Sequence, residues 1–415
     1  MSEAVAPVDQ PLAGKRIVLG VCGGIAVYKS VELLRLLTKA GATVDVVMTR
    51  NAQEFVTPLT FQTLSGRPVH TELFNLYQEQ EIGHISLADR ADLFVVVPAT
   101  ANLIGKVAGG IADDLLSTAL MATRSPVLYA PAMNVNMYEN QVVQDNLARL
   151  CQRGATLVEP VCGSLACGWE GKGKLAPVEE IFERALWLLT PQDLAGEHLL
   201  VTAGPTRERI DPVRYLSNDS SGLMGYALAR AARQRGAQVT LVSGPTALPA
   251  PLGVNLRRVE SAAQMLDAVL ATLPAATLVI KAAAVADYRP CQMAAQKLKK
   301  QQMAAPSLAL EKTPDILSQI AACKGDRLVV GFAAETERLL EHARDKLERK
   351  GLDLIVANDV TQAGAGFECA TNIVQILHAD GRCEALPCLT KWAVAHALLD
   401  RLVALRCQRA VDSPP

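Results

Sequence analysis

The sequence predicts an α/β fold of two doubly wound, Rossmann-like domains with mainly parallel sheets, and three observations support this. The chain has 415 residues, which is long for one domain. Half of these residues are hydrophobic but only 4% are aromatic, and such aliphatic chains pack helices onto parallel strands. A strand–turn–helix–strand plan also occurs twice, at residues 14–49 and 196–244.

The first copy of this plan begins with a buried strand, KRIVLGV, over Lys15–Val21. A glycine pair, Gly23 and Gly24, then leads into an amphipathic helix over Ala26–Lys39. The next strand, ATVDVVM, covers Ala42–Met48. A strand, a crossover helix and a second strand form a βαβ unit, whose two strands pair in parallel.

Further strands follow in both halves of the chain. In the first half, apolar runs predict buried strands at Leu93–Val97 and Val127–Ala130, and each leads into a polar loop. The second copy of the plan has a strand at Leu199–Thr202, a helix over Gly225–Arg235 and a strand at Gln238–Ser243. The same fold class is therefore expected twice.

The junction between the halves is expected near Pro191, where the apolar periodicity lapses. We therefore expect one domain over residues 1–192 and a second over residues 193–415. The 41 basic and 42 acidic side chains leave a net charge of −1, which argues against general electrostatic binding to nucleic acid or to an anionic membrane.

The sequence also predicts a cytoplasmic protein without a membrane partner. Its start does not resemble a signal peptide, and no apolar run reaches the length that spans a bilayer. The ten cysteines are not spaced like zinc ligands, so free thiols in a reducing compartment are the expectation.

Ligands of doubly wound sheets bind beyond the carboxyl ends of the strands, so the loops there are the places to search for function. Glycine turns at residues 23–24 and 222–225 each precede a helix start, whose free N–H groups suit a phosphate. Neither turn has the GxGxxG spacing, and no P-loop motif is present, so ordinary dinucleotide binding is not supported. For a glycine pair alone, simple turn geometry is an equally good interpretation.

Three polar positions in the first half could carry chemistry. His84 precedes a buried strand, Asn134 directly follows one, and Cys167 lies in the glycine-rich segment CGSLACGWEGKGK. Glycine-rich segments can form flaps, where a thiol reaches a bound ligand. Taken singly, the simpler interpretations are a structural histidine, a helix cap and an ordinary loop thiol.

Together these positions belong to a recognisable set of motifs. The segments GGIAVYK, HISLADRADL, PATANLIGKVAGGIADDLLST, PAMNVNM and GSLACGWEGKGK resemble the motifs of the FMN-dependent cysteine decarboxylases, in the family's order over residues 15–175. The first half is similar to the phosphopantothenoylcysteine decarboxylase part of the bifunctional bacterial enzymes of coenzyme A biosynthesis.

This resemblance implies a reaction and a set of residues. FMN takes two electrons from the thiol end of phosphopantothenoylcysteine, the resulting thioaldehyde loses CO₂, and the enethiolate is reduced and protonated to 4′-phosphopantetheine. By motif position, His84 lies near the flavin and substrate, Asn134 holds the substrate carboxylate, and Cys167 donates the final proton. The positions that correspond to FMN contacts are Gly23, Gly24, Thr49, Thr100, Asn102 and Ser117. One departure is Cys22, where the family usually has Ser or Thr.

The second half contains cationic segments that suit phosphorylated ligands. Arg207, Arg209 and Arg214 are gathered in a loop that leads to a predicted helix. Further on, KAAAVADYR places Asp287 after a strand, and QKLKKQ contains Lys297. Cations near an acid suit a nucleoside triphosphate with Mg²⁺, although a solvated helix face is the simpler interpretation of the lysine run alone.

With TPDIL, GFAAET and ANDV, these segments resemble phosphopantothenate–cysteine ligase in its CTP-using bacterial form, over about residues 196–400. The resemblance implies that 4′-phosphopantothenate is activated as an acyl-cytidylate and is then attacked by the amine of cysteine. Asn218 would stabilise the acyl-cytidylate step, Lys297 would act in its conversion, and Arg214 would hold the substrate phosphate. The positions that correspond to CTP contacts are Ala283, Asp287, Pro314, Asp315, Ile316, Leu317, Phe332, Lys346 and Lys350.

The ligase half departs from the family pattern at Asp219, Leu223 and Thr313, and the sequence assigns no metal ligands. The resemblance also implies a homo-oligomer, with trimers of the decarboxylase part and dimers of the ligase part. Two alternatives are a flavin-binding regulatory or interaction protein with a degenerate site, and a two-domain NAD(P)-dependent oxidoreductase. The joint presence of the three decarboxylase residues opposes the first, and the missing GxGxxG opposes the second.

Overall fold

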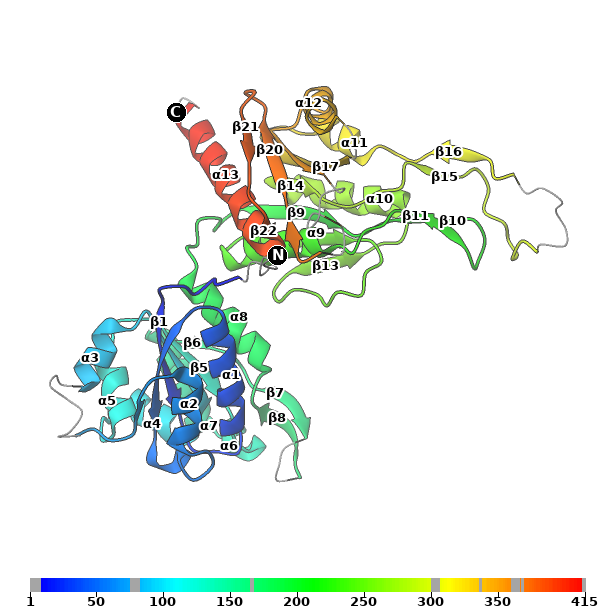
Figure 1. The fold of residues 1–415 in the computed structure, drawn as a ribbon. Coiled ribbons are helices and arrows are strands. Elements are labelled where there is room, and N and C mark those ends of the chain that lie inside the picture. Colours follow the sequence, from blue (N-terminus) through cyan, green and yellow to red (C-terminus); the bar gives the residue numbers. More distant parts are fainter. Residues whose placement is uncertain are drawn as a thin grey trace, which may run out of the picture. The chain divides into compact units, whose positions relative to one another are not determined.

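The computed structural model describes residues 9–74, 83–164, 168–299, 307–335, 338–359, 366 and 369–412. The chain divides between Thr190 and Pro191 into two compact units (Figure 1). We call Gln10–Thr190 the N-terminal unit and the residues from Pro191 onward the C-terminal unit. None of the helices within the described ranges is long and apolar enough to cross a membrane.

The N-terminal unit is built on a parallel sheet with the strand order β3-β2-β1-β4-β5-β6. The strands are β1 (Arg16–Val21), β2 (Thr43–Met48), β3 (Val69–His70), β4 (Leu93–Ala99), β5 (Val127–Pro131) and β6 (Thr156–Leu157). In β1, Ile17 and Leu19 pack into the core on one face of the sheet and Val18 into the core on the other. A strand that is buried on both faces needs the continuous apolar run that the sequence has there.

Helices cover both faces of this sheet. One face carries α1 (Val27–Lys39), α2 (Pro58–Ser65) and α8 (Val178–Leu189). The other carries α3 (Gly83–Arg90), α4 (Ala101–Gly109), α5 (Leu115–Ala122), α6 (Val135–Glu139) and α7 (Gln141–Gln152). A short helix, η1 (Arg50–Ala52), follows β2, and β7 (Val161–Ser164) with β8 (Glu170–Lys174) forms an antiparallel hairpin.

The C-terminal unit has an eight-stranded sheet with the order β13-β12-β9-β14-β17-β18-β20-β21. Its parallel strands are β9 (His198–Ala203), β12 (Gln238–Ser243), β13 (Asn255–Arg258), β14 (Leu278–Lys281), β17 (Leu328–Glu335) and β18 (Leu354–Asp359). Two antiparallel strands, β20 (Val374–His378) and β21 (Cys383–Ala385), complete one edge. The predicted fold of mainly parallel sheets is confirmed.

Helices cover both faces here as well. On one face lie α9 (Leu223–Gln234) and α13 (Lys391–Asp412), and on the other lie α10 (Ala262–Thr272), α11 (Ile316–Ala322) and α12 (Leu339–Arg349). The smaller elements are η2 (Leu273–Ala275) and the antiparallel pair β19 (Thr371–Asn372) and β22 (Leu389–Thr390).

Two antiparallel hairpins extend from the C-terminal unit's sheet, which the sequence did not predict (Figure 1). They are β10 (Arg207–Arg209) with β11 (Tyr215–Ser217), and β15 (Tyr288–Pro290) with β16 (Leu310–Lys312). Residues 291–299, between β15 and β16, form neither helix nor strand. The interpretation of Lys297 and Lys299 as part of a solvated helix face is therefore wrong.

Candidate active sites

The N-terminal unit has a cavity of about 1530 Å³ at the carboxyl ends of its central strands. Loops that follow β1, β2, β4 and β5 form its wall, as expected for a doubly wound sheet. Six of the residues that the sequence predicted for the decarboxylase site line it: Gly23, Gly24, Thr49, Thr100, Asn102 and Asn134.

Part of this wall consists of closely packed backbone and a helix start. A Cβ atom at Gly23 would lie 2.6 Å from the backbone carbon of Asn51, so only glycine permits this approach of two loops. At the start of α4, the Oγ1 of Thr100 accepts a hydrogen bond from the backbone N–H of Leu103 at 3.4 Å. The first turn of α4 therefore presents N–H groups and a partial positive charge at the wall.

A group of charged side chains lies on the same wall. The Nζ of Lys106 is 2.6 Å from Asp113 Oδ1 and 3.0 Å from Asp114 Oδ2. Burial disfavours the ionised carboxyl of Asp114, but bonds from the backbone of Ser117 and from Lys106 outweigh it and lower its pKa. The structure places Ser117 inside α5, fully buried, where it forms a capping box with Asp114. Ser117 is not among the residues that line the cavity.

Asn134 caps α6, because its Oδ1 accepts from the backbone N–H of Asn136 at 2.9 Å. Its NH₂ group is the end of the side chain that can donate to a carboxylate. The hairpin β7–β8 supports the loop that carries it, since the N–H of Met133 donates to the carbonyl of Gly173 at 3.0 Å. Asn134 thus combines the structural role of a helix cap with a position on the cavity wall.

The other two predicted catalytic residues of this half are not on that wall. His84 is the second residue of α3, is partly exposed, and is not among the residues that line the cavity. Cys167 lies outside the described residues. Cys22, which departs from the family pattern, is buried at the end of β1, and burial raises the pKa of its thiol to about 12. It is therefore a neutral thiol at physiological pH and adds no negative charge at the end of β1.

In the C-terminal unit, the predicted residues gather around the loops that follow β9 and β14. The Nδ2 of Asn218 donates to the carbonyl of Val285 at 3.1 Å. The backbone N–H of Ala283 donates to Thr202 Oγ1 at 3.2 Å, so the end of β9 orders the same loop. Asn218 and Ala283 are therefore joined through one short segment.

A second segment joins this group through Thr313, one of the departures from the family pattern. Its Oγ1 donates to the carbonyl of Ala286 at 2.6 Å, and its N–H donates to the carbonyl of Asp287 at 3.0 Å. Asp315 follows, caps α11, and is 2.5 Å from the Nζ of Lys350. Burial opposes its ionisation, but the bond from Lys350 outweighs this and lowers its pKa to about 2.

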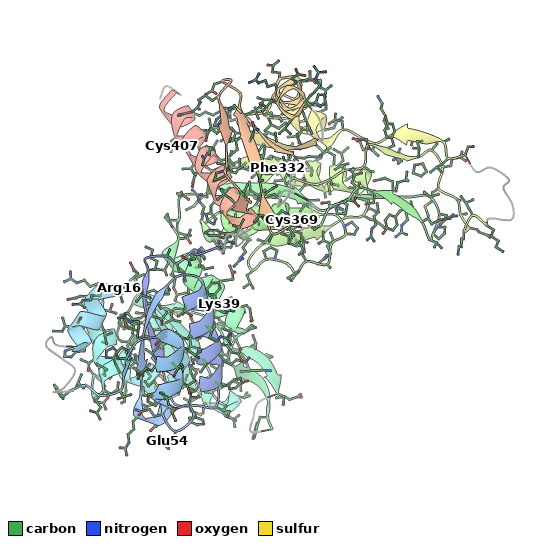
Figure 2. All side chains as sticks on the ribbon, viewed as in Figure 1. Arg16, Lys39, Glu54, Phe332, Cys369 and Cys407 are labelled. Carbon is green, nitrogen blue, oxygen red and sulfur yellow. The ribbon has the colours of Figure 1, made fainter. Side chains whose placement is uncertain are left out.

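The remaining predicted CTP contacts differ in what their side chains can do. Phe332 lies on β17 (Figure 2), and its carbonyl accepts from the Nζ of Lys346 at 3.1 Å. Pro314 is half-buried ahead of α11. The side chains of Ile316 and Leu317 are buried in the apolar core under α11. They are therefore available to a ligand only through their backbone.

Arg214 and Lys297 also differ from each other. The guanidinium of Arg214 is bonded to the carboxylate of Asp211, with Nη2 at 2.6 Å and Nε at 3.0 Å. Lys297, in contrast, is exposed. Within the described residues, no group of three His, Cys, Asp or Glu side chains is placed to hold a metal ion.

Family models match both halves of the chain. The model described as "Flavoprotein" matches residues 5–187, and the model described as "DNA/pantothenate metabolism flavoprotein C-terminal domain" matches residues 194–405. The coenzyme A biosynthesis bifunctional protein CoaBC of Bacillus subtilis (strain 168) is 49% identical over 401 residues, which are 96% of this chain and 98% of that protein. This chain belongs to the CoaBC family.

The chain is also similar to a second CoaBC protein and to two solved structures. The CoaBC protein of Escherichia coli (strain K12) is 47% identical over 396 residues, 94% of this chain and 97% of its own. A crystal structure of the C-terminal domain of a CoaBC protein is 44% identical, with a TM-score of 0.46, and covers 52% of this chain and 99% of that one. A PPC decarboxylase mutant complexed with pantothenoylaminoethenethiol is 30% identical, with a TM-score of 0.37, and covers 41% and 96%.

As a CoaBC protein, the chain is a bifunctional enzyme, a decarboxylase joined to a ligase, that acts in coenzyme A biosynthesis. The predicted function is confirmed at this level, and the alternative of a regulatory flavin-binding protein is not favoured. The match to the flavoprotein model supports FMN as the cofactor. The glycine turn, the first turn of α4 and the size of the cavity all fit such a group.

The sequence did not single out Lys281, whose charge interacts with those of the predicted residues Asp287, Asp315 and Lys346. Lys281 ends β14, and burial lowers its pKa to about 8, with a smaller contribution in the same direction from Lys346. The carboxylates of Asp287 and Asp315 act on it in the opposite direction. The available signal was a single charge at the end of the otherwise apolar strand LVIK.

Proposed function

We propose that the two activities are divided between the two domains expected from the sequence. Residues 1–192 would decarboxylate phosphopantothenoylcysteine with FMN, and residues 193–415 would join 4′-phosphopantothenate to cysteine with CTP and Mg²⁺. The observation that carries the first assignment is the meeting of Gly23, Thr100 and Asn134 at one cavity. The second rests on the group of Asn218, Asp315, Lys346 and Lys350 around the loops after β9 and β14.

In the decarboxylase site, the residues after β1 and β4 hold the FMN phosphate through backbone N–H groups. FMN, when bound, supplies the two-electron chemistry. Asn134 orients the carboxylate of the substrate with a neutral amide. Because an amide does not stabilise the carboxylate with a full opposite charge, it does not oppose the loss of CO₂. Cys167 donates the last proton to the product.

His84 leads to a proposal about assembly. Because it does not line the cavity of its own chain, we place it at the cavity of a neighbouring copy in a trimer of decarboxylase domains. There its imidazole would accept the thiol proton of the substrate. The ligase domains pair as dimers.

In the ligase site, cations bind the triphosphate and neutralise charge as pyrophosphate leaves. Lys297, Lys346 and Lys350 supply this charge, and Lys281 adds to it from the end of β14. Asn218 stabilises the acyl-cytidylate step, and the backbone of the segment from Pro314 to Leu317, with Ala283, Asp287 and Phe332, contacts the nucleotide. Mg²⁺ would be bound mainly by the phosphates, with few ligands from the protein, as is common for this ion. The free thiols of the described cysteines favour a reducing, cytoplasmic location.

The decarboxylase assignment is tested with Asn134→Ala in the FMN-loaded full chain. We expect CO₂ release from phosphopantothenoylcysteine to fall at least about 100-fold, because the carboxylate is no longer oriented. Asn140→Ala is the matched control, since Asn140 caps α7 in the same way but does not line the cavity. Equal activities of the two variants would show that Asn134 acts only as a cap.

The role of Cys167 has its own test. Cys167→Ser is expected to release CO₂ but to accumulate the oxidised enethiol product, which mass spectrometry identifies. Normal formation of 4′-phosphopantetheine by this variant would contradict the proton-donor role.

The ligase assignment is tested by measuring pyrophosphate release from CTP with 4′-phosphopantothenate, cysteine and Mg²⁺. Release should require the acid and should fall when ATP replaces CTP. Release that continues without 4′-phosphopantothenate would refute the assignment.

A further inference from the structure

The carboxylate of Asp211 is the centre of a bonded group next to the lysine segment. Its side chain has 0% exposed surface. Its Oδ1 accepts from the backbone N–H groups of Val213 and Arg214, both at 2.8 Å. Its Oδ2 accepts from Nε and Nη2 of Arg214 and from the backbone N–H of Leu298 at 3.2 Å. The turn before β11 is thereby tied to a residue far along the chain.

Arg214 completes this connection on the other side of Leu298. Its Nη2 also donates to the carbonyl of Leu298 at 2.8 Å. One ion pair therefore holds both backbone groups of a single residue, the N–H through the carboxylate and the C=O through the guanidinium. A third bond, from the N–H of Ala294 to the carbonyl of Ile210 at 2.9 Å, joins the same two segments.

The bonds made by Asp211 and Arg214 are important because residues 291–299 form no helix or strand that would fix their position. Such a segment takes its position from tertiary bonds, and Lys297 is directly next to the residue that is held. The guanidinium of Arg214 lowers the pKa of Asp211 well below its usual range, so the carboxylate stays charged at every working pH. Bonds between charged partners are also the stronger kind.

We propose that Asp211 is a positioning residue of the ligase, which acts with Arg214 to fix the backbone of Leu298 and thereby the place of Lys297. This rests on the proposed role of Lys297 in the ligase reaction. It also gives Arg214 a different main task from the phosphate contact expected from the sequence, because its Nε and Nη2 are already bonded within the chain.

The two roles of Arg214 predict different kinetics. If the Asp211–Arg214 ion pair positions Lys297, it acts on the chemical step. Its loss then lowers kcat and leaves the KM for 4′-phosphopantothenate nearly unchanged. A phosphate ligand contributes to substrate binding, so its loss raises that KM. Positioning of Leu298 also needs both members of the ion pair, so removing the second member after the first has little further effect on kcat.

The experiment compares Asp211→Asn, Arg214→Met and the double variant in the full chain, with CTP, 4′-phosphopantothenate, cysteine and Mg²⁺. We expect kcat to fall about 10- to 100-fold in each single variant, as for a displaced catalytic group, and no further in the double variant. The KM for 4′-phosphopantothenate should change less than about twofold, because substrate binding is untouched. Hydrogen exchange of peptides within residues 291–299 should accelerate in all three.

Arg289→Met is the matched control, because it breaks the ion pair of Arg289 with Glu311 at 2.8 Å between β15 and β16 and leaves Leu298 bonded. It should keep the wild-type kcat. Arg214→Lys is a second variant that should fold normally, because the side chain at this position is about half exposed. A lysine keeps the charge beside Asp211 but has a single nitrogen for both partners, so an intermediate kcat is expected.

Three results would overturn the proposal. They are a wild-type kcat in Asp211→Asn, losses that multiply in the double variant, and a large rise in KM that is confined to Arg214→Met. Failure of the proposed function itself is separate, because the wild-type chain would then release no pyrophosphate.

Discussion

The two units share one order of strands and helices, but their candidate sites consist of different groups. One is formed mainly by backbone around a cavity, and the other by charged side chains. In the N-terminal unit, the candidate site is a cavity of about 1530 Å³ whose wall contains glycine turns and helix starts. In the C-terminal unit, predicted side chains form ion pairs: Asp315 pairs with Lys350, and Arg214 pairs with Asp211, which the sequence did not predict. FMN needs space and close backbone contacts, whereas the triphosphate of the proposed CTP would compete for cations that already pair with carboxylates.

This difference indicates how each site can be disturbed. The N-terminal site should be sensitive to small additions of volume, because its loops approach each other at backbone distance. The C-terminal site should be sensitive to charge and pH, because its geometry depends on ion pairs. The following predictions test this contrast.

Lys297→Gln should have the largest effect. We expect ligase kcat to fall about 100- to 1000-fold, the usual loss for one preorganised group at a transition state. Pyrophosphate release measures it, and decarboxylation by the same variant is the internal control. Because the two units have separate cores, CO₂ release should be unchanged. An equal loss of both activities would contradict the independence of the units.

Gly173→Ala should show the steric sensitivity of the N-terminal site. The new Cβ would lie 2.4 Å from the carbonyl oxygen of Met133, so the loop that carries Asn134 must move. We expect about a 100-fold loss of CO₂ release, as for a misplaced positioning group. Gly163→Ala is the control from the same hairpin, because its Cβ meets only the side chain of Lys174. If both variants retain bound FMN and equal activity, the hairpin does not position Asn134.

His396 should make the C-terminal unit sensitive to acid. It packs against Trp392, with ring centroids 4.1 Å apart, and burial lowers its pKa to about 4. As the pH falls, the unfolded chain takes up this proton first, so the folded state loses roughly 2 kcal/mol between pH 7 and pH 5. Urea unfolding followed by the fluorescence of Trp392, with Trp169 and Trp187 replaced by Phe, measures this loss. It should shrink in His396→Gln, and an identical pH dependence would exclude His396 as its source.

Lys281 should give the smallest effect, on the pH dependence of CTP binding. Its pKa of about 8 means that it loses its charge as the pH rises through 8. Only about a tenth of these side chains stays protonated one unit above the pKa, so the KM for CTP should rise several-fold by pH 9. Lys281→Arg should keep a low KM across this range, and Lys281→Met should show a high one throughout. A flat wild-type profile would remove Lys281 from the site.

Much of the N-terminal site could be predicted from the sequence because its parts are local. Gly23, Thr100 and Asn134 each follow a strand that the apolar pattern reveals, and parallel strands end at one edge of the sheet. Ser117 illustrates the limit, since its place in the motif did not show that its hydroxyl is used inside a capping box. His84 shows another limit, because a motif position does not tell which cavity a side chain can reach.

The sequence by itself determined the α/β fold, the two copies of the plan and the loops that form the candidate sites, because apolar periodicity and glycine turns are short-range features. Only the tertiary structure decided which charges pair. Arg214 and Leu298 are 84 residues apart, and Asp315 and Lys350 are 35 apart. Such bonds depend on how hairpins and helices meet across the whole unit, and no local pattern encodes that meeting.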